Sequence, residues 1–168
     1  MPRILVFTCT GLGALFVLWL GGRLPATVSS HFGIGGTADA HMPRDLFVAV
    51  FVLLTVAVPL LSWWLQVQAV SRGKAKIPDA AHWFSPAQRE RTVGFLQAHA
   101  AWFAVMVCAL FCYTFWRVVA ANTPPSAPAS LPLAQFWGGV LVLLLLSAAW
   151  LWVLHARFGR DAGPLAER

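Results

Sequence analysis

The segment Leu46–Leu65 reads LFVAVFVLLTVAVPLLSWWL and contains no charged residue. The hydrocarbon core of a bilayer is about 30 Å thick, and a helix of about 20 apolar residues is needed to cross it. Three other stretches have a similar length and character: Ile4–Gly22, Ala98–Ala121 and Phe136–Leu154. The four stretches together predict an all-α membrane protein, with four transmembrane helices packed as one helical bundle.

The composition agrees with a membrane protein and excludes an ordinary soluble domain. Of the 168 residues, 59% are hydrophobic and only 11% are charged, whereas soluble domains carry roughly 25% charged residues. The formal net charge is +6. Because the basic residues cluster beside the apolar stretches, we expect them to meet anionic lipid head groups rather than nucleic acid.

The distribution of Lys and Arg predicts the orientation, since these residues are retained in short cytoplasmic loops. The first connecting loop holds two, Arg23 and Arg44, and the third connecting loop holds none. Both termini and the middle loop are therefore predicted to be cytoplasmic (N-in/C-in). Arg117 is at the outer end of the third span, where we expect it to extend toward the head groups. The predicted cytoplasmic set comprises nine residues: Arg3, Arg72, Lys74, Lys76, Arg89, Arg91, Arg157, Arg160 and Arg168.

The first span is predicted to be a retained signal-anchor helix. Its apolar run is about 19 residues long, whereas the apolar region of a cleaved signal peptide has about 7–15, and no small-residue cleavage site follows it. The chain then divides into four segments. Residues 1–66 carry two spans and an outer loop, 67–97 form a basic cytoplasmic loop, 98–155 form a transmembrane hairpin, and 156–168 form a cytoplasmic tail.

Within the cytoplasmic loop, Ser85 and Pro86 predict the start of a helix that continues into the third span, with Ser85 as its N-cap. Trp83 and Phe84, just before it, are expected at the membrane interface. The third connection, Asn122–Pro132, contains four prolines and predicts an extended segment. The basic side chains expected to face lipid or a protein partner are Arg72, Lys74, Lys76, Arg89 and Arg91.

The outer loop contains the most unusual sequence, LPATVSSHFGIGGTAD, at residues 24–39. Its glycines allow positive φ angles and predict a tight turn that folds over the mouth of the bundle. Asp39 or His41 is expected to lead into the second helix, with Pro43 near the first turn and Asp45 favourable at the helix N-terminus.

This loop resembles the DUF1648 domain of SdpI-like bacterial membrane proteins, whose pattern L-P-x-x-[IV]-x-x-H-F-x-x-x-G-x-x-D lies between two membrane helices. The resemblance covers residues 11–61 well and the remainder loosely. The chain departs from the pattern at Thr37-Ala38, where many members have a proline before the aspartate, and at Arg44, where a lysine is common. The matching positions are Leu24, Pro25, Val28, His31, Phe32, Gly36 and Asp39.

The resemblance implies a multi-pass protein of the bacterial inner membrane. Namesake members confer immunity to a secreted toxic peptide and take part in signalling by holding a repressor at the membrane. They also carry additional membrane helices, so an immunity role for this shorter chain is an expectation by analogy.

Two chemical interpretations of the outer loop remain open. His31, Asp39 and His41 are weak candidates for a metal site, because two imidazoles and a carboxylate can bind Zn²⁺. Their spacing matches no established zinc motif, and His31 and Asp39 could equally serve to structure the turn. Cys9, Cys108 and Cys112 are interpreted as packing residues rather than a disulfide framework.

The sequence contains no nucleotide-binding glycine loop, nucleophile elbow, CxxC motif or haem attachment motif. We therefore expect a non-enzymatic protein without a cofactor, with an outer loop that binds an extracytoplasmic peptide or other ligand and a cytoplasmic loop that meets a protein partner. The alternatives are a small transporter component and a membrane metal-binding protein.

Overall fold

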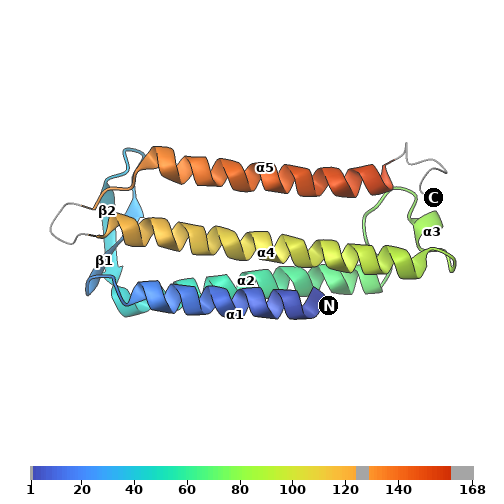
Figure 1. Ribbon diagram of the computed structural model, residues 1–168, viewed down its shortest axis with the longest axis horizontal. Helices are drawn as coiled ribbons and strands as arrows, with labels where there is room; N and C mark the ends of the chain where they lie inside the picture. Colours follow the sequence, from blue (N-terminus) through green and yellow to red (C-terminus); the bar gives the residue numbers. More distant parts are fainter. Residues whose placement is uncertain (1, 124–128, 160–168) are drawn as a thin grey trace.

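A computed structural model describes residues 2–123 and 129–159, and its four long helices run side by side (Figure 1). Each is long and apolar enough to cross a membrane, so the four predicted spans are confirmed as helices. The long helices are α1 (Pro2–Gly21), α2 (Arg44–Ser71), α4 (Arg89–Ala121) and α5 (Leu133–Phe158). The short elements are β1 (Thr27–Phe32), β2 (Ala38–Pro43) and the single turn α3 (Ala80–Trp83).

Helices α2 and α4 extend furthest beyond the predicted spans. At 1.5 Å per residue, the 28 residues of α2 and the 33 residues of α4 give lengths of about 42 Å and 50 Å. Both exceed a hydrocarbon thickness of about 30 Å, so part of each helix must lie outside it. The connection between them is therefore shorter than the predicted loop 67–97, because α2 ends at Ser71 and α4 begins at Arg89.

The expectation of an all-α chain is wrong at the outer loop, where β1 and β2 pair as an antiparallel hairpin. The hairpin lies across one end of the long helices (Figure 1). Asp39 and His41 lie in β2 and do not lead into α2, which begins after Pro43. Polar and apolar residues alternate in β2 (ADAHMP) but not in β1 (TVSSHF), so the strand period of two is visible in only one of the two segments. The expectation that Asp45 lies in the first turn of α2 is confirmed.

The core lies among α1, α2 and α4, and is largest at the hairpin end. There, Val17 and Leu20 of α1, Phe47 of α2 and Phe115 of α4 are all buried in one cluster. The rings of Phe47 and Phe115 are stacked with centroids 5.7 Å apart, a spacing typical of favourable aromatic pairs. The hairpin residue Val28 belongs to the same cluster, so the outer loop is part of the core rather than a separate appendage.

Helix α5 is attached differently from the other three. It packs mainly on α4 and lies apart from α1 and α2 in Figure 1. None of the residues in its membrane-spanning window is buried. The predicted bundle is therefore a closed three-helix core of α1, α2 and α4 with one peripheral helix.

Candidate functional site

The β-hairpin is shaped by a glycine turn at its tip. Gly33 N–H donates to the carbonyl of Thr37 (2.9 Å), and Gly36 N–H donates to the carbonyl of Gly33 (2.8 Å). Gly36 has a φ of +77°, which an L side chain adopts only with strain. The sequence prediction of a glycine turn over the bundle is thus confirmed, with Gly36 as the position that requires glycine.

His31 and Asp39 meet across the hairpin, with His31 Nδ1 2.5 Å from Asp39 Oδ1. Both side chains face outward, with exposed fractions of 70% and 52%. The strand register places His31 opposite Ala40 and His41 opposite Ser29. No group of three or more metal-binding side chains occurs in the described part of the chain, so His41 does not complete the proposed metal triad.

The other residues of the loop motif hold the hairpin against the bundle. Leu24 and Val28 are buried in the core cluster at the hairpin end, and Phe32 packs against it. Pro25 is half-buried just before β1, where its fixed φ suits an extended entry. The motif therefore contains two kinds of residue: an apolar set that anchors the hairpin, and the His31–Asp39 pair that faces outward.

Asn122 joins the hairpin to the end of α4, which the sequence did not predict. Its Oδ1 accepts a hydrogen bond from Ser29 N–H (2.9 Å), and its Nδ2 donates to the carbonyls of Ser29 (3.1 Å) and Val118 (2.9 Å). The only signal in the sequence is an asparagine at the end of a long apolar helix, a position that asparagine often occupies. Nothing local indicates that its partner lies 93 residues away.

The hairpin tip is also bonded to the segment that leads into α5. Leu131 N–H donates to the carbonyl of Gly36 (2.9 Å), and Ser130 pairs with Thr37 as an isolated antiparallel bridge. A Cβ atom at Gly36 would lie 2.5 Å from the carbonyl oxygen of Leu131. The predicted extended connection Asn122–Pro132 falls partly on residues 124–128, which lie outside the described residues; its end, at Ser130 and Leu131, is paired with the hairpin.

Arg117 does not extend to the head groups as predicted. Its side chain is only 6% exposed, and its Nη2 donates to Oε1 of Gln135 on α5 at 2.6 Å. The guanidinium also lies 5.1 Å from the ring centroid of Trp116. This arginine is therefore a buried contact between α4 and α5.

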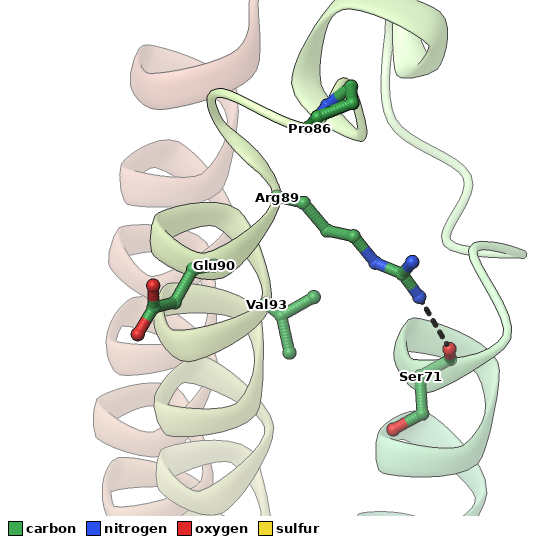
Figure 2. Close-up of a pocket in the computed structure, with 5 residues that line it drawn as sticks. All are labelled: Ser71, Pro86, Arg89, Glu90 and Val93. Atoms are coloured by element: carbon green, nitrogen blue, oxygen red, sulfur yellow. Dashed lines mark hydrogen bonds between the residues drawn. The ribbon is translucent and has the colours of Figure 1, made fainter.

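The other end of the molecule carries the basic surface. The five predicted basic residues between α2 and the first turns of α4 are all exposed. Figure 2 shows Arg89 reaching across a pocket of about 440 Å³ toward Ser71, while Glu90 points away from it. Arg89 Nη2 donates to the Ser71 carbonyl at 3.4 Å. Pro86, Glu90 and Val93 complete the lining of this pocket.

One expectation for this loop, the N-cap at Ser85, needs correction. Helix α4 begins at Arg89, with no side-chain hydrogen bond at its N-cap, Gln88; Ser85 contributes only its carbonyl, to Gln88 and Arg89 N–H. Trp83 and Phe84 pack against a cluster of Val70, Leu96 and Phe158. Both side chains are half-buried in this packing, and their expected place at the membrane interface stays a prediction.

The three cysteines are free, and Cys108 Sγ lies 3.6 Å from the backbone carbonyl of Cys9. This contact joins α4 to α1 and agrees with a packing role.

The sequence matches no family model, and neither a curated protein nor a solved structure matches it.

Proposed function

We propose that this chain is a non-enzymatic integral membrane protein whose hairpin binds an extracytoplasmic ligand. The observation that carries the proposal is the attachment of the hairpin at two places. Asn122 fixes its base to α4, and Leu131 fixes its tip to the entry of α5. A polar loop held this firmly against a core presents its exposed side chains in a fixed arrangement, which a recognition surface requires.

An extended peptide is the ligand class that fits this hairpin best. Among residues 2–123 and 129–159, β2 pairs with β1 alone, and the bridge to Ser130 covers only the tip. The outer edge of β2 thus offers backbone donors and acceptors for an added strand. The His31–Asp39 pair on the exposed surface would supply polar specificity.

The loop residues support membership of the DUF1648, SdpI-like group as part of the same proposal. Each motif position has a physical role that explains its residue type: Leu24 and Val28 fill the core, and Gly36 takes a positive φ. Under this proposal the chain belongs to a bacterial inner membrane, and its ligand is a toxic or signalling peptide.

The orientation in this proposal follows the positive charges. With both termini in the cytoplasm, the hairpin faces outward and the basic residues meet anionic lipid or a cytoplasmic protein. The pocket beside Arg89 and Ser71 is then a surface for a partner segment, which would contact the basic side chain of Arg89 at the start of α4 and the acidic side chain of Glu90.

A transporter role has less support. Transport pathways place ionisable side chains near mid-membrane depth. The buried ionisable residues of α4 in the described chain, His99 and Arg117, lie toward opposite ends of that helix. Between them the helix carries no charged residue, only thiol and hydroxyl groups such as those of Cys108 and Tyr113.

Site-specific photocrosslinking in living cells tests the proposal. A photoreactive residue at His41, on the β2 surface, should capture a peptide from the medium or periplasm, and His31→Ala with Asp39→Ala should reduce that capture. The same probe at Trp102, an exposed residue of α4, is the control. The proposal is wrong if His41 captures only lipid and deletion of the chain leaves peptide sensitivity and partner recovery from crosslinked membranes unchanged.

A further inference from the structure

Helices α4 and α5 are joined by polar contacts at two separate levels. Toward the hairpin, Tyr113 donates its hydroxyl hydrogen to the Gln135 carbonyl (2.5 Å), next to the Arg117–Gln135 contact. Toward the basic loop, Trp150 Nε1–H donates to the His99 carbonyl (3.0 Å). The rings of His99 and Trp150 are stacked with centroids 4.1 Å apart and an interplanar angle of 12°.

An apolar cavity of about 480 Å³ occupies the interface between α4 and α5. Each helix contributes residues at spacings of three, six, seven and ten, which place them on one face. Several of the residues that line the cavity are exposed, including Trp102 and Leu146, so the cavity opens to the surface of the molecule. The lining comprises His99, Trp102, Val105, Met106 and Ala109 from α4, and Leu143, Leu146, Ala149, Trp150 and Val153 from α5.

The cavity has one polar element, at the level nearest the basic loop. His99 is 8% exposed, and its Nε2 has no hydrogen-bond partner among the described residues. A buried polar atom without a partner is costly, and such atoms in native structures often mark the place of a missing partner. A polar group at this end of the cavity would therefore be stabilised.

A basic residue stands just beyond His99. The guanidinium carbon of Arg157 lies 4.6 Å from the ring centroid of Phe95, and Phe95 stacks on His99 with centroids 5.5 Å apart. Arg157 is exposed, and a guanidinium presents five N–H donors. Arg157 does not line the cavity itself; it lies one aromatic ring beyond the lining residue His99, on the side of Phe95. Going inward, a cation is followed by a polar imidazole and then by an apolar lining.

This order of groups matches that of a phospholipid. We propose that the α4–α5 cavity binds one acyl chain of an anionic phospholipid, with its ester region near His99 and its phosphate on Arg157. The lipid comes from the leaflet on the side of the basic loop, and its second chain stays in the bilayer. Apolar cavities exclude water and take apolar ligands, and at this depth acyl chains are the abundant ones. Basic pockets between membrane helices bind anionic head groups.

Photocrosslinking of the full-length chain in nanodiscs tests the site. The discs contain phosphatidylcholine with a small share of phosphatidylglycerol whose acyl chain carries a diazirine. We expect adducts on the cavity residues, mapped by mass spectrometry. Ala149→Trp and Ala109→Trp, on opposite walls, should each abolish them, whereas Leu144→Trp, on the exposed α5 surface outside the lining, should not.

The head-group contact has its own test. Arg157→Gln should lower the yield of phosphatidylglycerol adducts about fivefold, the effect of one basic residue beside an anionic lipid. Arg23→Gln, at the hairpin end of α1, should leave the yield unchanged. Circular dichroism and gel filtration confirm that each variant is folded. Equal yields with phosphatidylcholine as the photoreactive lipid would overturn the role of Arg157. Adducts that persist in both cavity-filling variants would overturn the lipid site itself.

Discussion

Asn122 and Ser29, which are 93 residues apart in the sequence, exchange two hydrogen bonds in which the amide side chain of Asn122 acts like the edge of a strand. Both residues are buried. The backbone N–H and carbonyl of Ser29 would otherwise face the end of the bundle without a partner. One side chain thus closes the hairpin onto α4.

Asn122→Ala should therefore destabilise the protein by about 1–3 kcal/mol, because the buried groups of Ser29 lose their partner. The measurement is the midpoint of thermal unfolding in detergent. Thr123→Ala is the matched control, since Thr123 is exposed and its hydroxyl donates to the Val119 carbonyl of the adjacent helix α4 rather than to the hairpin. Equal effects of the two substitutions would contradict the role of Asn122.

The hairpin tip provides a second matched pair, at Gly36 and Gly35. Gly36→Ala forces an L side chain to a φ of +77° and against the Leu131 carbonyl, which should cost about 1–3 kcal/mol of local strain. At Gly35 a Cβ has nothing within 4 Å, so Gly35→Ala should be tolerated. Hydrogen exchange at the Leu131 amide, which bonds to Gly36, should accelerate only in Gly36→Ala.

Mutations in the loop motif should fall into two groups: those at buried residues should lower the stability of the protein, and those at the exposed His31–Asp39 pair should leave it nearly unchanged. Leu24→Ala removes a buried side chain from the core cluster and should destabilise by about 2–5 kcal/mol. His31→Ala breaks an exposed pair, which is worth about 1 kcal/mol or less. Unfolding midpoints measure both. A large loss of stability in His31→Ala would show that the pair is structural and would weaken the proposal that it contacts a ligand.

The attachment of α5 depends on close approach at Gly139. A Cβ atom there would overlap the Tyr113 ring, whereas at Gly138 it would meet nothing within 4 Å. Gly139→Ala should therefore separate α4 from α5 and break the Tyr113–Gln135 hydrogen bond, while Gly138→Ala should not. Spin labels at Ala109 and Ala149 report the change as a longer distance, and an unchanged distance would contradict the packing.

The orientation can be measured by labelling introduced cysteines. In a background with Cys9, Cys108 and Cys112 replaced by alanine, Ile34→Cys at the fully exposed tip should react in intact cells with a thiol reagent that does not cross membranes. Lys76→Cys should react only after the cells are broken open. The reverse pattern would overturn the N-in/C-in orientation.

The long helices were predictable from the sequence because their signal is local. A run of apolar residues such as Leu46–Leu65 must form a helix in lipid, where every backbone polar group needs an internal partner. The ends of α2 and α4 were less predictable, since the residues beyond the spans contain enough good helix formers to continue the helix into water. Ser85 has the residue type of an N-cap, but the turn Ser85–Gln88 precedes α4 instead.

In the outer loop, the turn could be predicted from neighbouring residues, whereas the strands and the side-chain pairing could not. The glycine turn was predictable because only glycine readily takes the φ of Gly36. The strands were not, since their stability comes from contacts with distant segments, such as Val28 on the core and Ser29 on Asn122. Likewise, His31 and Asp39 are eight residues apart, and only the register of the hairpin decides that they pair and His41 does not.

The two attachments of the hairpin have a mechanical consequence. Its base is bonded to the last turn of α4 through Asn122, while its tip is bonded to Leu131 at the entry of α5. If a bound ligand tilts the tip relative to the base, either the Leu131 bond breaks or the start of α5 follows. Because α5 touches little besides α4, it is the helix that can move most easily. If it tilts as a rigid body, its far end is displaced at the opposite membrane surface.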